Sequence, residues 1–157
     1  MTPHRRDQIR HATPADLDSL LALEQATFTC DRISRRQSRR HLSSTSSSVL
    51  VIGTLGDIRA AAVIFYRRNS HSARLYSLAV HNSDRGNGFG ATLLAATEAD
   101  ARSHGCTTMN LEVRTDSPSA IALYERHGFQ RRAQLPAFYE DGSNAWRYAK
   151  TLTPVTR

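Results

Sequence analysis

A glycine-rich turn at residues 84–91 most constrains what this chain can fold into, because it separates two segments of different pattern. Residues 73–81 before the turn are typical of a β-strand, and residues 91–104 after it are typical of a helix. Residues 107–114 again have the pattern of a strand. A strand, a helix and a second strand in this order predict a βαβ unit, whose two strands run parallel.

The same turn predicts a site for an anion. Backbone N–H groups in the first turn of a helix have no partner within the helix, and the helix dipole adds about half a positive charge there. The glycines at positions 86, 88 and 90 let a phosphate approach the main chain closely. We therefore predict that residues 86–91 hold a pyrophosphate.

Two other phosphate-binding folds are disfavoured. Gly86, Gly88 and Ala91 satisfy the loose dinucleotide fingerprint, with Glu112 about 20 residues beyond, where a ribose-binding acid is expected. A doubly wound dinucleotide domain needs further βαβ units, but only about 45 residues follow Glu112 and the preceding half has the pattern of an antiparallel hairpin. A nucleoside-triphosphate P-loop is excluded, since no Lys-Ser or Lys-Thr follows the glycines.

The remaining segments predict further strands and helices around this unit. Strands are expected at residues 8–12, 49–55, 58–68, 129–133 and 145–152, with residues 56–57 as a hairpin turn. Helices are expected after Thr13-Pro14, at residues 34–42 and from Ser117-Pro118 to Gly128, and residues 43–48 are expected to form a mobile loop. The sheet is therefore mixed, with one crossover in the middle.

Length and composition predict one domain with an anionic partner. A chain of 157 residues that is 39% hydrophobic fits a single domain over 1–157, with short flexible ends at about 1–6 and 153–157. A net charge of +7 favours an anionic partner. Residues 1–10 lack the apolar core of a secretory signal, and no run of about 18 apolar residues occurs, so we expect a cytoplasmic protein without a membrane partner. Cys30 and Cys106 are far apart in sequence, and we expect no metal site.

Three motifs in order resemble the GNAT N-acetyltransferase superfamily. Arg85-x-x-Gly88-x-Gly90 matches its signature at a strand-to-helix turn, and residues 75–80 and 111–114 are similar to the two strands beside it. Residues 120–129, AIALYERHGF, are similar to a run in bacterial ribosomal-protein-alanine N-acetyltransferases. The resemblance covers about nine tenths of the chain. It implies an α/β (α+β) fold with a mixed, mostly antiparallel sheet of about seven strands, a central parallel splayed strand pair and about four flanking helices.

This resemblance implies an acetyl-CoA-dependent N-acyltransferase, and it assigns cofactor-binding residues. The turn would hold the pyrophosphate, the strand before it would pair with the pantetheine arm, and a main-chain N–H there would polarise the thioester carbonyl. The residues so implied are Leu78, Ala79, Val80, Arg85, Gly86, Asn87, Gly88, Phe89, Gly90, Ala91 and Ser117. Ser117 stands where the family usually has asparagine, so this contact is expected to be weaker or water-mediated, and the serine is also a candidate helix cap.

Acetyl transfer to an amine needs two proton transfers, for which Glu112 and Tyr124 are the candidates. On a strand, Glu112 shares one face with Arg114, away from the apolar face, so its carboxylate looks toward a cleft. The resemblance implies that Glu112 is the base and Tyr124 the acid. In the competing interpretations Glu112 is a salt-bridged strand residue, with Arg114 as its partner, and Tyr124 is an amphipathic core aromatic.

The acceptor amine is predicted from its pKa. An α-amine with a pKa near 8 is about 10% neutral at pH 7, whereas a lysine must first lose a proton at a cost of about 4 to 5 kcal/mol. This argument and the resemblance both favour a protein N-terminus, such as that of a ribosomal protein. Many domains of the family with the same residues act on small amines, aminoglycosides or lysines, so these acceptors remain alternatives. Residues 30–42 and 135–144 are expected to line the acceptor side, with Arg114 and Tyr139 as substrate-binding candidates.

Two other functions remain open at this stage. Eight arginines, in pairs along the chain, suggest a ribosome- or RNA-binding module: Arg35, Arg36, Arg39, Arg40, Arg67, Arg68, Arg131 and Arg132. The cluster at residues 35–40 has no interleaved aromatic residues for base stacking, which disfavours nucleic acid as the main partner. Ser117 suggests the other possibility, a protein that binds CoA with little or no catalysis.

Overall fold

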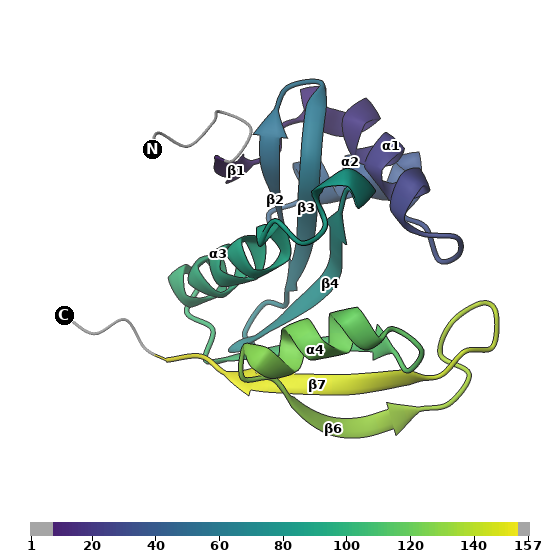
Figure 1. The fold of residues 1–157 in the computed structure, drawn as a ribbon. Coiled ribbons are helices and arrows are strands. Elements are labelled where there is room, and N and C mark those ends of the chain that lie inside the picture. The colour runs from purple at the N-terminus through teal and green to yellow at the C-terminus, as the bar shows by residue number, and fades with distance from the viewer. Residues whose placement is uncertain (1–7, 154–157) are drawn as a thin grey trace.

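The computed structural model describes residues 8–153, and in this part of the chain seven strands form one sheet with four α-helices around it (Figure 1). The strands are β1 (Ile9–His11), β2 (Ser47–Thr54), β3 (Asp57–Tyr66), β4 (Ser72–Val80), β5 (Thr108–Arg114), β6 (Gln130–Leu135) and β7 (Ala145–Thr151). The helices are α1 (Leu17–Thr27), α2 (Arg35–Ser43), α3 (Phe89–Ser103) and α4 (Pro118–Arg126). The predicted flexible ends lie almost entirely outside the described residues.

The sheet order is β1-β2-β3-β4-β5-β7-β6, and every pair is antiparallel except β4 with β5. The predicted mixed sheet with one parallel pair is therefore confirmed. The predicted loop at residues 43–48 is too long at both ends. Ser43 is the last residue of α2, and Ser47 and Ser48 already pair with Phe65 and Ile64 as the start of β2. None of the described helices is long and apolar enough to cross a membrane.

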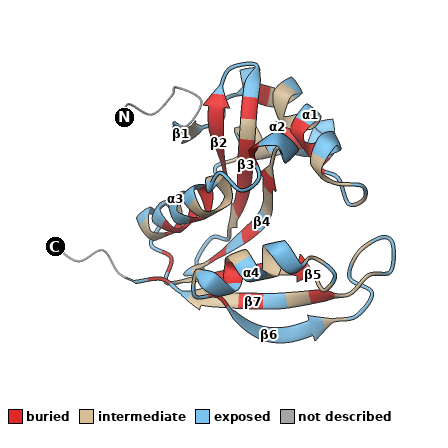
Figure 2. Cartoon of the chain, viewed as in Figure 1, coloured by how far each residue is buried: buried red, intermediate tan, exposed pale blue. Residues whose placement is uncertain are grey.

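In the half of the sheet formed by β1 to β4, the central strands β2 and β3 are buried on both faces. Along β2 and β3 the side chains alternate between two cores, as the period of two requires. Leu50 and Ile52 pack toward α3 with Leu94, whereas Val49 and Val51 pack with Leu23 of α1. Figure 2 shows the resulting run of buried residues in β2 and β3.

The half formed by β5, β7 and β6 has one apolar and one polar face. Met109, Leu111 and Val113 of β5 pack in a core that includes Tyr124 of α4. The alternate residues Asn110, Glu112 and Arg114 lie on the opposite face, as the sequence predicted. The edge strand β6 is exposed over almost its whole length (Figure 2).

The two halves meet where β4 and β5 part. These strands pair from Ser72 with Thr108 to Leu75 with Leu111, and the pairing ends there. β4 continues to Val80 on its other side, paired with β3. In the described residues, the edge of β4 that faces β5 therefore has no strand partner from residue 76 to residue 80. This splayed pair creates an opening in the middle of the sheet.

Candidate active site

The glycine turn continues directly from the open edge of β4. Leu78, Ala79 and Val80 end the strand, a short 3-10 turn follows at Asn82–Asp84, and α3 begins at Phe89. Arg85, Gly86, Asn87 and Gly88 form the turn, while Phe89, Gly90 and Ala91 begin the helix. Gly86 and Gly88 have φ values of 88° and 79°, a conformation that favours glycine. Gly88 is the residue before the helix, so no side chain covers the first-turn N–H groups.

The charge at this turn suits an anion. Asp84 is buried, and Nε of Arg59 in β3 donates a hydrogen bond to its carboxylate at 2.6 Å. This pair fixes the turn against the sheet and neutralises the acid closest to it. The first turn of α3 contains no acidic residue, and Arg85 is exposed. The helix dipole therefore presents its positive end without a competing free carboxylate.

Gly90 has a separate role in packing. A Cβ at this position would lie 3.3 Å from Cδ2 of Leu123 in α4, so the absence of a side chain lets α3 and α4 approach closely. The helix start, the left-handed glycines and the open edge of β4 fit a long phosphorylated ligand: the phosphates at the turn, and an amide-bearing arm along the strand.

Glu112 lies at the opening, paired with two arginines. Its side chain is 7% exposed. Nη2 of Arg74 in β4 lies 2.6 Å from Oε1, and Nε of Arg147 in β7 donates to Oε2 at 3.3 Å. Glu112 is therefore salt-bridged, as the competing interpretation of this residue stated, but its partner is not Arg114. Arg114 instead pairs with acids of nearby loops. Residues directly opposite on neighbouring strands are closer than residues two apart on one strand, and Glu112 is opposite Arg147.

Arg114 instead organises the loops on the acceptor side. It pairs with Asp116 at 3.0 Å and with Asp141 at 2.8 Å, which holds the pKa of both carboxyls below the usual range. Its guanidinium lies 5.1 Å from the centre of the Tyr139 ring. The α1–α2 loop joins the same group, because Asp31 accepts a hydrogen bond from the backbone N–H of Glu140 at 3.2 Å. The structure therefore brings together the two segments predicted to line the acceptor side.

Two tyrosines are relevant to proton transfer: Tyr124 packs on the apolar face of β5, and Tyr139 is the one whose pKa responds to Glu112. Tyr124 of α4 is buried edge-on against Phe129, with ring centres 5.8 Å apart, and burial raises its pKa. Burial and the charge of Glu112 raise the pKa of Tyr139 to about 12. Both phenols therefore keep their protons at neutral pH, which a proton donor requires. Tyr139 also raises the pKa of Tyr124, though less than burial does.

Ser117 occupies the residue before α4, but its side chain forms no cap hydrogen bond. Its backbone carbonyl accepts from Ile121, and its N–H donates to the carbonyl of Arg114 at 3.2 Å. The interpretation of this serine as a side-chain helix cap is therefore wrong.

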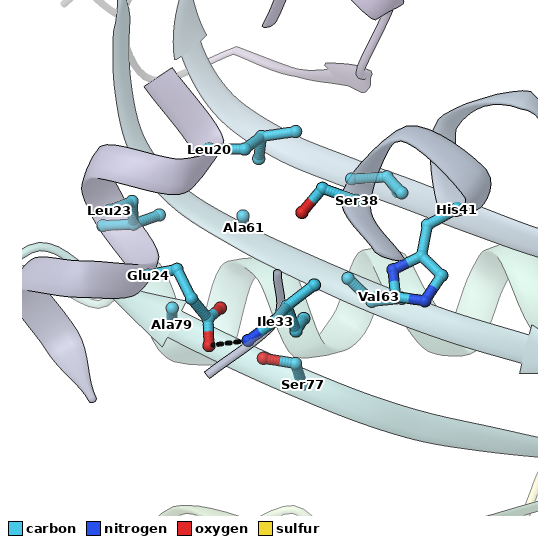
Figure 3. A pocket seen from close by; sticks show the side chains of 11 residues that line it. Leu20, Leu23, Glu24, Ile33, Ser38, His41, Ala61, Val63, Ser77 and Ala79 are labelled. Carbon is cyan, nitrogen blue, oxygen red and sulfur yellow. Dashed lines mark hydrogen bonds between the residues drawn. The ribbon is translucent and has the colours of Figure 1, made fainter. Parts of the chain in front are cut away.

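A buried carboxyl that the sequence analysis did not single out lies on the acceptor side of β4. Glu24 of α1 faces a cavity of about 30 Å³ beside Ser77 and Ala79 (Figure 3). One oxygen accepts the backbone N–H of Ile33 at 3.1 Å, and burial raises the pKa of this carboxyl. The signal was present in the sequence, because Glu24 continues the apolar stripe of Leu20 and Leu23 at helical spacing.

The chain matches a known family over most of its length. The sequence model of the Acetyltransferase (GNAT) family matches residues 17–129. Among curated proteins, N-alpha-acetyltransferase 30 of Schizosaccharomyces pombe is 34% identical over 71 residues, 45% of this chain and 47% of that protein. An uncharacterised N-acetyltransferase of Methanocaldococcus jannaschii is 34% identical over 90 residues, 57% of this chain and 58% of that protein. The chain thus spans about half the length of these curated relatives.

Solved structures are similar over nearly the whole chain. Ard1 from Thermoplasma volcanium has a TM-score of 0.80 at 28% identity, covering 93% of this chain and 97% of that one. A ribosomal-protein-alanine N-acetyltransferase from Brucella melitensis has a TM-score of 0.79 at 26% identity, covering 92% and 99%. The ribosomal-protein-S18-alanine N-acetyltransferase of Escherichia coli has a TM-score of 0.83, covering 96% of both chains, and at 24% identity it shows the fold alone.

Proposed function

The chain belongs to the acetyltransferase (GNAT) family, and from this premise we propose that it transfers the acetyl group of acetyl-CoA to the α-amine of a protein N-terminus. One observation carries the proposal: a carboxylate, Glu112, lies where β4 and β5 part, next to the open edge of β4. Relatives and structural neighbours named for N-alpha and ribosomal-protein-alanine acetylation support this class of acceptor.

The cosubstrate would lie along the open edge of β4 and the glycine turn. The first-turn N–H groups of α3 would hold its pyrophosphate, with Arg85 beside it. The unpaired backbone of Leu78, Ala79 and Val80 would pair with the pantetheine arm as an added strand. A main-chain N–H of this segment would polarise the thioester carbonyl, and the free hydroxyl of Ser117 is the proposed side-chain contact to the arm.

We assign the two proton transfers to Glu112 and Tyr124. The neutral amine forms a bond to the acetyl carbon, and the bond from that carbon to the CoA sulfur breaks. Glu112 takes the proton that the amine loses, directly or through a water, and Tyr124 gives its phenol proton to the departing thiolate. Arg114 and Tyr139 are proposed to contact the acceptor.

The acceptor is best an α-amine, for a reason of charge. Carboxylates are weak bases, and the proposed base here is the carboxylate of Glu112, which lies between Arg74 and Arg147. A weak base suits an amine that is about 10% neutral at pH 7 more than a lysine that is almost wholly charged. We propose a cytoplasmic location, because acetyl-CoA and new protein N-termini meet there.

The test is acetylation of an amidated peptide that starts with alanine and contains one internal lysine. We expect release of CoA thiol and, by fragment mass spectrometry, acetyl groups on the α-amine alone. The Tyr124→Phe variant should turn over more slowly while acetyl-CoA still raises its melting midpoint, by about 5 to 10 °C at 100 times the dissociation constant. Acetylation of the lysine, or of small amines only, would replace the N-terminal acceptor with another, and loss of the midpoint shift would contradict the cofactor site.

A further inference from the structure

Two arginines approach the carboxylate of Glu112 from opposite sides. Arg74 reaches Oε1 from β4 with Nε at 2.9 Å and Nη2 at 2.6 Å. Arg147 reaches Oε2 from β7 with Nε at 3.3 Å. The three side chains lie on one face of the sheet, at the place where the acceptor amine of the proposed reaction must arrive.

This cluster has more positive charge than Glu112 needs. Two guanidiniums face one carboxylate, so the group carries one net positive charge. The side chains of Arg74 and Arg147 are 44% and 46% exposed, so both remain open to solvent. Each guanidinium has five N–H donors, and Arg147 contacts Glu112 through Nε. The contact through Nε does not use the N–H donors of the two terminal nitrogens.

The acids of the nearby loops have contacts of their own. Asp116 and Asp141 both pair with Arg114, and Asp31 accepts the backbone N–H of Glu140, so none of these contacts uses Arg74 or Arg147. On the other side, Arg74 lies 5.4 Å from the centre of the exposed Tyr76 ring, which stacks on Phe65 at 4.5 Å. The cluster of Arg74, Glu112 and Arg147 therefore carries one net positive charge and lies beside the stacked rings of Tyr76 and Phe65. The whole chain has a net charge of +7.

We propose that Arg74 and Arg147 bind an acidic group of the acceptor, and that the preferred acceptor is a peptide N-terminus with aspartate or glutamate in its first two residues. This inference rests on the proposed function. Successive Cα atoms are about 3.8 Å apart, so an acidic side chain at these positions reaches the arginines while the amine lies beside Glu112. A carboxylate of the acceptor would share the guanidinium donors that Arg74 and Arg147 otherwise give to Glu112.

The experiment compares amidated peptides that differ only at position two: Ala-Asp, Ala-Asn and Ala-Lys followed by one common sequence. The measured quantity is the ratio of kcat/KM for the Asp peptide to that for the Asn peptide. We expect a preference on the order of tenfold for Asp, and the reverse order for Lys, since only the Asp side chain offers the guanidiniums a charged acceptor. The preference should weaken as salt concentration rises.

Variants then identify the residues responsible. Arg74→Gln and Arg147→Gln should each lower the ratio, and the double variant should bring it close to one. Because both arginines touch Glu112, the rates themselves will change, but a ratio between two peptides cancels that loss. Arg147→Lys should keep part of the preference. Arg68→Gln makes the same charge change at an exposed position between β3 and β4 and should leave the ratio unchanged.

The outcomes separate this inference from the proposed function. If the Asn peptide is acetylated at its α-amine but the Asp peptide gains nothing, or if the ratio survives both substitutions, the anion site is wrong and the proposed function stands. If acetyl-CoA binds and no peptide is acetylated, the proposed acceptor fails and the inference falls with it. Free aspartate, assayed in parallel, overturns the peptide acceptor if it alone is acetylated.

Discussion

The two halves of the sheet treat a carboxylate in different ways. In the half formed by β1 to β4, Asp16 is wholly buried and Arg10 donates to both of its oxygens, at 2.8 and 2.9 Å. In the half formed by β5, β7 and β6, Glu112 is contacted by two half-exposed arginines from separate strands. The first is a closed pair, in which one cation satisfies one anion. The second is an open cluster with donors to spare.

This difference separates a structural contact from a chemical one. A bidentate arginine fixes both partners and leaves little for a ligand to bind. The Arg10–Asp16 pair joins β1 to the start of α1, where the backbone N–H of Thr13 also donates to Asp16 at 2.8 Å. The Glu112 cluster spans β4, β5 and β7 across the opening in the sheet, so its contacts can be exchanged when an acceptor arrives.

Glu112→Gln should have the largest effect of the substitutions that test this difference, because an amide cannot take the amine proton. We expect kcat to fall by about 10²- to 10⁴-fold, the usual contribution of general acid–base catalysis, with acetyl-CoA binding nearly unchanged. Steady-state rates and the melting midpoint with and without acetyl-CoA measure both quantities.

Glu98→Gln is the matched control for this substitution. Glu98 of α3 is as buried as Glu112 and pairs with Lys150 at 2.7 Å, on the apolar side of β5 and away from the opening. Its loss should lower stability and leave kcat close to that of the parent. Equal rates in Glu112→Gln and the parent would remove Glu112 from the reaction.

Asp16→Asn is expected to have a smaller effect than Glu112→Gln, and the effect should be on stability and not on kcat. It removes a charge-assisted pair in a buried position, so the free energy of unfolding should fall by about 1 to 3 kcal/mol while kcat stays the same. Arg10 holds the pKa of Asp16 below its usual range, so this stability is present above the unfolded-state pKa and is lost as pH falls through the folded-state pKa.

Urea unfolding of parent and Asp16→Asn at pH 7 and at stepwise lower pH measures this effect. The two curves should converge in acid. A difference that persists unchanged below the folded-state pKa, or a fall in kcat at neutral pH, would show that Asp16 is more than a closed structural pair.

The sequence predicts elements and their order better than contacts between them. Apolar alternation and turn residues locate all seven strands, and the glycine turn locates the parallel pair. The partners of Glu112 were not predictable in this way, since Arg74 and Arg147 are 38 and 35 residues distant and meet it only through strand register. Arg114, two residues away, was the wrong choice because its own loops supply better partners. The burial of the Glu112 side chain likewise depends on neighbouring strands that no local pattern identifies, whereas that of Glu24 follows from its place on the apolar stripe of α1.

Glu24→Gln should have the smallest effect, and it tests a second kind of buried carboxyl in the first half of the sheet. Burial raises the pKa of Glu24, so the folded protein binds this proton more tightly than the unfolded chain does. The stability that this provides is present below the unfolded-state pKa and is lost as pH rises through the folded-state pKa. A glutamine does not ionise and can still accept the N–H of Ile33. The variant should therefore gain stability relative to the parent as pH rises from 4 to 8, by a few degrees in melting midpoint at most.

Two features of the cavity make this measurement specific. His41 lines the same cavity, and burial lowers its pKa, but its own titration is common to parent and variant and cancels in their difference. Asp18→Asn makes the same chemical change at an exposed position of the same helix and should give a flat difference with pH. If the stability difference between Glu24→Gln and the parent also stays constant with pH, ionisation of Glu24 does not lower the stability of the folded protein. The first half of the sheet would then hold a free carboxylate beside β4, and Glu24 would compete with Glu112 for the acceptor proton.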